Sequence, residues 1–439
     1  MSTDTGAVRR RRRYDAADRP FTVVWEPTRG RRRDCGEPVP DRYRRELDTA
    51  AAEDLLDQVA AFGQPAPLFL ITGDDPFQRP DLTELITYAR EIGVRVAVAA
   101  TGATKVTENQ LRAVAAAGAV ELALGLDGST AALHDDFHRA PGAFHRVLDA
   151  WDTALALGLK VRINTTIGRR NLDDLPDVVR VVAERGAFLW SACFPTHIDR
   201  ARPLGMLTAD EVEDLLSFVY DVCQTVSATT TDARHFRRVA LQRRILADLA
   251  EDHVAVLGLG GLYRELTDRA AALGLYSVRR RTRRPLLEGD PVRGCVFVSH
   301  TGSVHSSGSL PVSAGNVRER SLMSMYRTSP LFTGLRADGM LGGRCGRCEF
   351  RRACGGSRSR AYYMTGNPFA EEPLCGYVPG SFPYQRVVAA QLHAGEPAEP
   401  ETAPCPSVAR DSEDHRAPEY PSAPSLWHRW LAPHPGHDL

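Results

Sequence analysis

Four cysteines toward the carboxyl end of the chain have a spacing that could hold a metal. They occur as Cys345-x2-Cys348-x5-Cys354, followed by Cys375. Two cysteines three residues apart can bind one metal centre from a tight turn, and the other two complete the coordination shell. Four thiolates suit either a tetrahedral zinc ion or a four-iron cluster. The sequence therefore predicts a metal site, and the thiolates alone leave zinc and iron–sulfur both open.

The residues around these cysteines favour a metal site over four unrelated thiols. Glycines let the backbone approach sulfur closely, and arginines offset the negative charge of thiolates. The glycines are Gly343, Gly346, Gly355 and Gly356, and the arginines are Arg344, Arg347, Arg351 and Arg352. Thiols that fall close together by chance would not need this context, so we expect metal ligation.

Upstream of the cysteines, short apolar runs alternate with amphipathic helical segments. The expected strands are 21–25, 68–72, 94–99, 120–126, 160–166 and 188–194, and the expected helices are 52–62, 80–92, 107–117, 142–157 and 173–185. This alternation predicts an α/β fold with a parallel sheet, either doubly wound or a partial barrel. In both architectures the chemistry lies at the carboxyl ends of the strands, and polar residues follow each expected strand here.

Charge balance and apolar patterning exclude two classes of partner. The 439 residues include 55 Lys plus Arg and 55 Asp plus Glu, so the chain lacks the basic excess of a nucleic-acid-binding protein. No apolar stretch approaches the roughly 18 residues of a membrane-spanning helix. The arginines at 9–13 precede a polar segment rather than the apolar part of an export signal. We therefore expect a cytoplasmic protein with reduced cysteines.

Several segments together resemble radical S-adenosylmethionine (SAM) enzymes that carry a C-terminal SPASM domain. The resemblance is strongest to the branch that matures peptides and cofactors and modifies haem-type tetrapyrroles. The segments are 21–29, 72–76, 126–128 and 163–166, together with the four cysteines. This resemblance implies a partial (β/α)6 TIM-like barrel, followed by a small Cys-rich SPASM-type iron–sulfur module.

The resemblance also implies ligands and boundaries. Cys345, Cys348, Cys354 and Cys375 would hold one auxiliary [4Fe–4S] cluster, with zinc as the alternative, and Gly73, Asp75 and Asn164 would contact SAM, which we expect this chain to bind weakly if at all. A second SPASM cluster is not expected, because the positions near Ser307 and Arg358 are not cysteines. The expected parts are a disordered tail at 1–19, the barrel at 20–204, a helical bridge at 205–289, the cluster-binding module at 290–385 and a disordered Pro-rich tail at 386–439.

One motif departs from the family pattern. Family members place a Cys-x3-Cys-x2-Cys triad after the first strand, where its thiolates hold the cluster that reduces SAM. In this sequence the three positions are Arg31, Cys35 and Pro38. A guanidinium stays protonated and has no lone pair to donate, and proline has no ligand atom, so Cys35 is the lone remnant. Nearby, Asp74 replaces a glycine and Gly125 replaces a serine of the family pattern.

These departures lead to an expected function with alternatives. We expect a degenerate homologue in peptide, cofactor or natural-product maturation, acting as partner or scaffold for an intact radical SAM homologue, or presenting a peptide or small molecule to it. One alternative is an active enzyme with an atypical initiation cluster that uses Cys35 and ligands from elsewhere. The others are a zinc module on a substrate-binding barrel and a sequence fault confined to 30–40.

Other polar residues receive ordinary interpretations. The run Arg31-Arg32-Arg33 is expected to be a solvated loop rather than an anion site. His134, His138 and His197 are expected on helix surfaces or loops, because no carboxylate lies at catalytic spacing from them. No side chain is assigned a catalytic role.

Overall fold

The computed structural model describes residues 15–28, 46–73, 75–196, 205–276 and 294–393. Of these, the residues up to Ala389 belong to one compact unit. Within the described part of the chain, no helix is long and apolar enough to cross a membrane.

A ten-stranded sheet organises this unit, in the order β10-β9-β8-β1-β2-β3-β4-β5-β6-β7. The strands are β1 (Thr22–Trp25), β2 (Leu68–Ile71), β3 (Val96–Ala100), β4 (Glu121–Gly125), β5 (Lys160–Thr166), β6 (Leu189–Cys193), β7 (Ala228–Thr231), β8 (Cys295–Val298), β9 (Ser303–His305) and β10 (Ser313–Asn316). All pairs from β8 through β1 to β7 are parallel, and β9 and β10 are antiparallel. The predicted α/β partial barrel is confirmed, and each expected strand lies within two residues of an observed one.

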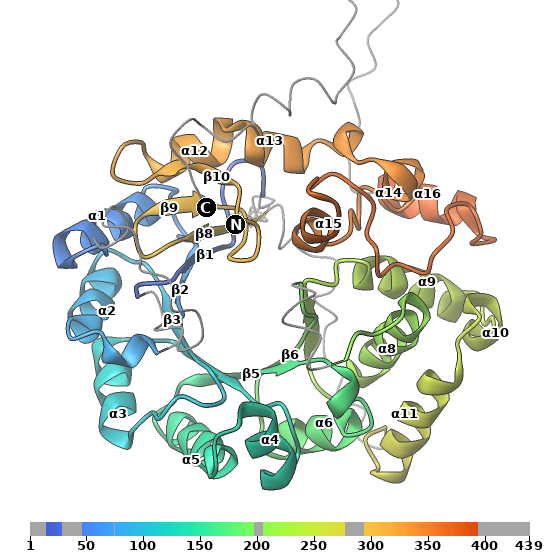
Figure 1. Ribbon diagram of the computed structural model, residues 1–439, viewed down its shortest axis with the longest axis horizontal. Helices are drawn as coiled ribbons and strands as arrows, with labels where there is room; N and C mark the ends of the chain where they lie inside the picture. The colour runs from blue at the N-terminus through green and yellow to red at the C-terminus, as the bar shows by residue number, and fades with distance from the viewer. Residues whose placement is uncertain (1–14, 29–45, 74, 197–204, 277–293, 394–439) are drawn as a thin grey trace, which may run out of the picture. The chain divides into compact units, whose positions relative to one another are not determined.

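The helices between these strands lie on the outer side of the curved sheet (Figure 1). They are α1 (Thr49–Ala60), α2 (Leu82–Glu91), α3 (Glu108–Ala117), α4 (Ala131–His138), α5 (Ala143–Ala156), α6 (Leu175–Glu184), α8 (Ala209–Val222), α9 (Phe236–Asp248), α10 (His253–Leu257) and α11 (Gly261–Ala272). Asp81 precedes α2 without a side-chain hydrogen bond to its first turn, and Gly93, with φ of 79°, follows the helix.

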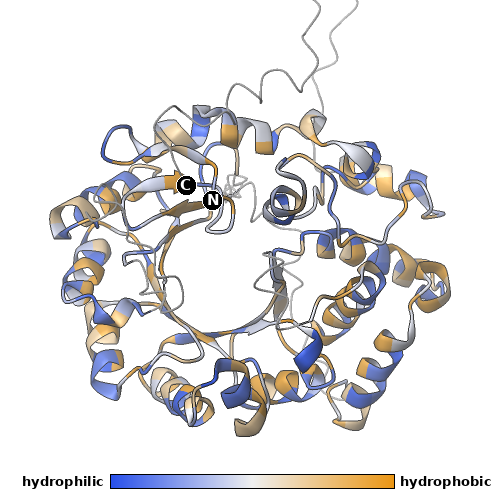
Figure 2. Ribbon diagram, viewed as in Figure 1, coloured by the Kyte–Doolittle hydropathy of each residue, from blue (hydrophilic) through white to orange (hydrophobic). Residues whose placement is uncertain are grey.

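Strand register separates two faces of the sheet. Side chains alternate along a strand, so every second residue points to the same face. The face under the helices is apolar and includes the fully buried Trp25, Ile163 and Trp190, and Figure 2 shows apolar residues along the strands and the neighbouring helix sides. On the other face, Gly125 of β4 is paired in register with Asn164 of β5, so the two positions share that face.

The C-terminal segment continues the sheet of the barrel. β8 pairs in parallel with β1 and also forms an antiparallel hairpin with β9. Helices α12 (Leu322–Thr328), α13 (Pro330–Arg336), α14 (Gly343–Arg347) and α15 (Arg358–Thr365) follow, before α16 (Gln385–His393). The cysteine-rich segment thus joins the barrel sheet through β8.

Two segments expected as tail have structure. In the N-terminal segment, the hydroxyl of Tyr326 donates to the carbonyl of Ala16, and Arg327 lies 2.9 Å from the carboxylate of Asp18. At the other end, α16 begins at Gln385 and ends at His393. These segments are polar enough to suggest tails, but contacts with α12 order the first of them.

Two elements were not expected. β7 is the polar run Ala228-Thr229-Thr230-Thr231 inside a stretch that we expected to be mostly helical. α4 buries only His134, so its sequence lacks the apolar stripe that predicts a helix. β7 forms because its backbone pairs with that of β6. α4 forms because its histidine side chains find partners just after the end of β4.

Candidate functional site

The four predicted cysteines line one pocket, together with residues of α9 and of the loop before α16. Cys345 lies in α14, and Cys348 directly follows that helix. Cys354 is in the turn before α15, and Cys375 is in the loop that leads to α16. The structure thus places the four cysteines around one pocket, and their binding of a metal stays a prediction.

Close backbone packing shapes this pocket. A Cβ atom on Gly346 would lie 2.1 Å from the carbonyl oxygen of Leu341, and one on Gly356 would lie 2.6 Å from Cβ of Glu372. Gly355 and Gly356 also have φ of 73° and 66°, a region that side chains rarely adopt. These glycines therefore let the cysteine-bearing turns approach one another closely.

Hydrogen-bond donors surround the sulfurs. The Glu372 backbone N–H donates to Cys345 Sγ over 3.3 Å, and a guanidinium nitrogen of Arg238 lies 3.8 Å from Cys375 Sγ. Burial raises the pKa of the Cys348 and Cys354 thiols to about 12. The metal-free thiols are therefore neutral at pH 7, and metal binding must displace their protons.

Two groups of side chains in the described part of the chain have the residue types of a metal site. The four cysteines suit either a tetrahedral zinc ion or a four-iron cluster. Asp127, His134 and His138 offer ligand atoms that all lie within 4.8 Å of one another.

The positions of a second SPASM cluster carry ordinary protein contacts. The hydroxyl of Ser307 lies 3.0 Å from that of Ser359. The buried Arg358 donates to the carbonyl oxygens of Pro368 and Ala370 over 3.0 and 2.7 Å. A hydroxyl and a guanidinium therefore occupy positions where a cluster would need thiolates.

The residues expected to contact SAM lie at two places along the sheet. Gly73 follows β2 with φ of 123°, and a Cβ there would lie 3.4 Å from Cγ of Glu26. The carboxylate of Asp75 accepts from the backbone N–H of Phe77 over 3.1 Å and caps a single helical turn. Asn164 lies on β5, with β3 and β4 between it and β2. Their contact with SAM stays a prediction.

The end of β4 carries a histidine–carboxylate pair that the sequence analysis missed. His138 Nε2 lies 2.7 Å from a carboxylate oxygen of Asp127, whose other oxygen accepts from the backbone N–H of Thr166 over 2.5 Å. The expectation that these histidines lack a carboxylate partner was therefore wrong for His138. The sequence pattern that could have predicted this pair is an aspartate at a strand end followed by a histidine in the next helix. Recognising the pattern requires that α4 be predicted as a helix.

His134 holds this arrangement in place rather than binding metal. Its Nδ1 accepts from the backbone N–H of Asp127 over 3.1 Å, so Nε2 carries the hydrogen and donates to the carbonyl of Gly102 over 3.1 Å. Burial lowers the pKa of His134, and the nearby His138 lowers it further. With both ring nitrogens engaged, His134 is a structural support between two strand ends.

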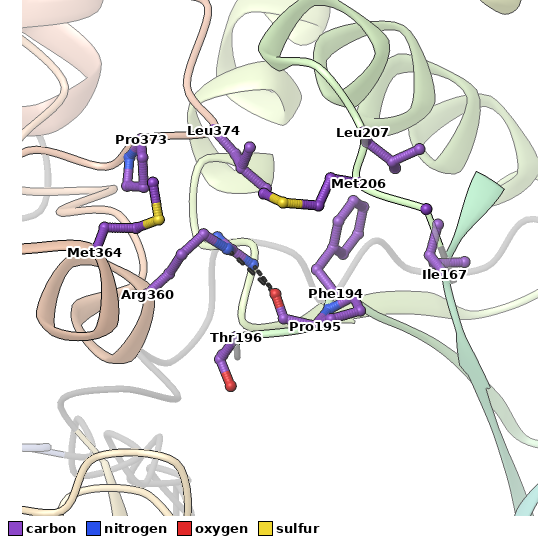
Figure 3. Close-up of a pocket in the computed structure, with 11 residues that line it drawn as sticks. Ile167, Phe194, Pro195, Thr196, Met206, Leu207, Arg360, Met364, Pro373 and Leu374 are labelled. Atoms are coloured by element: carbon purple, nitrogen blue, oxygen red, sulfur yellow. Dashed lines mark hydrogen bonds between the residues drawn. The ribbon is translucent and has the colours of Figure 1, made fainter. Parts of the chain in front are cut away.

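An apolar pocket lies between the ends of β5 and β6 and helix α15 (Figure 3). Its lining residues are Ile167, Phe194, Pro195, Thr196, Gly205, Met206, Leu207, Arg360, Met364, Pro373 and Leu374. Met206 and Met364 are 42% and 45% exposed, so both side chains are accessible at the pocket. Arg360 points toward the carbonyl of Pro195, to which it donates over 3.2 Å, and pairs with the buried Glu372 over 2.9 Å.

Several residues singled out in the sequence lie outside the described residues. They are Arg31, Arg32, Arg33, Cys35, Pro38, Asp74 and His197.

Sequence comparison defines the class of protein. Residues 33–182 match the Radical SAM superfamily. The chain is 32% identical over 369 residues to AdoMet-dependent heme synthase of Oleidesulfovibrio alaskensis, covering 82% of this chain and 88% of the relative. The chain therefore belongs to the radical SAM superfamily, whose members use SAM and a [4Fe–4S] cluster.

Other relatives and solved structures agree with this class. AdoMet-dependent heme synthase of Methanosarcina barkeri is 31% identical over 82% of this chain and 97% of the relative. Mycofactocin maturase MftC of Mycobacterium tuberculosis is 27% identical over 82% of this chain and 83% of the relative. The structure of SuiB from Streptococcus suis aligns with a TM-score of 0.56 at 15% identity, covering 82% of this chain and 76% of SuiB.

These comparisons bear on the expected function. The matches cover most of the chain, and the relatives of at least 30% identity given above are heme synthases. They do not support the expected role as a degenerate partner or the doubt about SAM. They favour the alternative, an active radical SAM enzyme.

Proposed function

We propose that the protein is a SAM-dependent iron–sulfur enzyme that modifies a haem-type tetrapyrrole. The observation that carries the proposal is the 32% identity to a heme synthase over 82% of the chain. The aligned part of the chain is longer than the barrel alone or the cysteine-rich segment alone. The similarity therefore includes the elements that would bind SAM, substrate and cluster together.

The four-cysteine pocket supports the cluster part of the proposal. Cys345, Cys348, Cys354 and Cys375 would hold a [4Fe–4S] cluster, which supplies one-electron transfer when bound. The chain contributes donors toward the sulfurs, from the Glu372 backbone to Cys345 and from the Arg238 guanidinium to Cys375. Such donors offset thiolate charge.

The apolar pocket supports the substrate part. A tetrapyrrole is a flat ring with a largely apolar face, which suits contact with a wall of methionine, leucine and phenylalanine side chains. The cavity of about 40 Å³ is too small to enclose the ring, so the ring would lie against this wall rather than inside it. Arg360 donates to the carbonyls of Pro195 and Asp232 and to the carboxylate of Glu372. We therefore assign Arg360 to holding the pocket wall in place rather than to binding a substrate carboxylate.

The usual initiation motif does not fit this sequence. Of the three family positions only Cys35 is a thiol, because Arg31 and Pro38 cannot coordinate iron. A cluster in this part of the chain therefore needs ligands besides Cys35. This sequence observation favours a second candidate function, in which the chain binds a peptide or small molecule and serves an intact radical SAM homologue.

SAM cleavage separates the two candidates. Protein reconstituted without oxygen is incubated with SAM and dithionite, and 5′-deoxyadenosine and iron are measured. The enzyme proposal expects product above the no-protein control and about eight irons per chain for two clusters. The change Cys35→Ala should abolish the product, whereas Cys223→Ala, at a buried thiol of the α8 end, should not. No product with about four irons would support the partner function.

The substrate is tested with an iron porphyrin. One relative, 28% identical, is named Fe-coproporphyrin III synthase, so iron coproporphyrin is the probe. We expect its Soret band to shift on binding, with at least tenfold weaker binding in Met364→Glu and little change in Met364→Leu. Met364 is 45% exposed, so neither change should disturb folding. Equal binding by both variants would place the substrate elsewhere.

A further inference from the structure

One buried histidine faces the cysteine pocket and takes no part in the contacts described above. His235 directly precedes α9, is 0% exposed and lines the pocket with the four cysteines. Neither ring nitrogen has a hydrogen-bond partner among the described residues. Buried side-chain nitrogens nearly always have one, so this ring is unusual.

Charged groups lie close to the ring but are engaged elsewhere. Glu372 accepts from the backbone N–H groups of Ser357 and Leu374 and pairs with Arg360. Glu213 pairs with Arg238 over 2.5 Å. The carboxylates that act on His235 through space therefore have other partners, and the imidazole keeps a free N–H donor.

The first turn of α9 directs two side chains to the same pocket. His235 and Arg238 are three residues apart and therefore lie on one side of the helix, and both line the pocket. Arg238 already approaches Cys375 Sγ to 3.8 Å. The one histidine among the described lining residues thus lies beside a residue that contacts a candidate ligand sulfur.

We propose that His235 donates an N–H hydrogen bond to a sulfur of the cluster held by the four cysteines and thereby sets its reduction potential. This inference rests on the proposed cluster. Reduction adds one negative charge to the cluster, so a donor stabilises the reduced form more than the oxidised form. His235 is therefore a positioning and tuning residue supplied by α9, outside the cysteine motif.

The test compares variants in a Cys35→Ala background, which removes the thiol of the initiation motif. The reduction potential is measured by EPR-monitored titration of protein reconstituted without oxygen. We expect a more negative potential in His235→Phe, which keeps a ring but loses the donor, and partial return in His235→Gln, which keeps an N–H. The control His145→Gln, on α5, should match the parent protein.

A second readout is independent of any folding defect in the variants. With 15N-histidine in the parent protein, the reduced cluster should show a nitrogen hyperfine coupling that disappears in His235→Gln. Absence of that coupling in the parent protein, or an unchanged potential in iron-replete His235→Phe, would overturn the inference. Failure of the parent protein itself to take up iron would instead overturn the proposed cluster.

Discussion

At the scale of single residues, oppositely charged side chains form ion pairs around the cysteine pocket. Arg238 is 3% exposed at its side chain and pairs with Glu213, which also accepts from the backbone of Gly376 next to Cys375. Burial disfavours the charge of Arg238, but the adjacent Glu213 outweighs this and raises its pKa. The guanidinium therefore remains charged beside the sulfurs, where it offsets thiolate charge.

Removing one member of this pair should destabilise the protein strongly. Glu213→Ala leaves the buried Arg238 without its counter-charge, and breaking a buried pair in this way costs about 3–5 kcal/mol. The free energy of unfolding in urea, measured on metal-free protein, checks this. Glu184→Ala, which removes an exposed i,i+4 partner of Arg180 on α6, should cost less than about 1 kcal/mol. Equal costs would contradict the prediction.

His134 should make stability depend on pH in mild acid. Its pKa in the folded protein is lowered from 6.5, first by burial and then by His138. Below about pH 6.5 the unfolded chain takes up a proton that the folded ring does not, so stability present above that pH is lost as pH falls. Each unit of pKa depression corresponds to about 1.4 kcal/mol.

The variant His134→Gln checks this assignment. An amide can still accept from Asp127 and donate to Gly102, but it does not titrate. Chemical denaturation at several pH values from 7 to 5 should therefore show a smaller loss of stability in His134→Gln than in the parent protein. His145→Gln on α5 serves as the control and should keep the parent slope. An unchanged slope in His134→Gln would assign the acid sensitivity to other groups.

At the scale of elements, short helices position side chains of the candidate sites. α4 brings His138 to Asp127 after β4, and α14 brings Cys345 into the cysteine pocket. Each helix has at most eight residues, too few to be stable alone in water. Their positions therefore depend on tight contacts with neighbouring backbone.

Gly346 is such a contact. In Gly346→Ala the new methyl group would lie 2.1 Å from the carbonyl oxygen of Leu341, so α14 must shift and carry Cys345 with it. We expect a several-fold loss of iron per chain after reconstitution. Gly339→Ala is the matched control, since nothing lies within 4 Å of its Cβ position. Iron content that is the same in both variants would show that α14 tolerates the shift.

The sequence predicted these elements unevenly, for physical reasons. The apolar strands and amphipathic helices of the barrel were predictable because their periodicity reports burial directly, and the cysteine spacing pointed to one pocket. The pairing of His138 with Asp127 was missed because it depends on α4, which has no apolar stripe. His235 was missed because a single histidine before a helix has no local pattern, and its burial arises only from packing of α9 on the cysteine-rich segment.

At the scale of the whole described unit, one sheet joins the barrel to the cysteine-rich segment. β8 pairs with β1 along four residues, from Thr22 with Cys295 to Trp25 with Val298. α15 adds a second connection, because Arg360 donates to the carbonyls of Pro195 and Asp232 near the ends of β6 and β7. Neither part can therefore separate without losing buried hydrogen bonds.

We expect the two parts to unfold together. Tryptophan emission in urea, measured in a Trp427→Phe, Trp430→Phe background, reports the barrel through Trp25, Trp151 and Trp190, which are all 0% exposed. Pulsed thiol labelling with mass spectrometry reports Cys354, which is 8% exposed. Coincident midpoints in metal-free protein are the signature of one cooperative transition. Labelling of Cys354 at lower urea than the change in emission would instead show that the cysteine-rich segment opens first.

The pairing of β1 with β8 also has a consequence during synthesis. About 270 residues separate Thr22 from its partner Cys295, and a ribosome adds roughly 5–20 residues per second. One edge of β1 therefore stays unpaired for roughly 14–55 s until β8 is synthesised. During that time its backbone donors and acceptors are exposed to other nascent chains. Productive expression of this protein should accordingly respond to chaperones that bind extended segments, and to translation speed between β7 and β8.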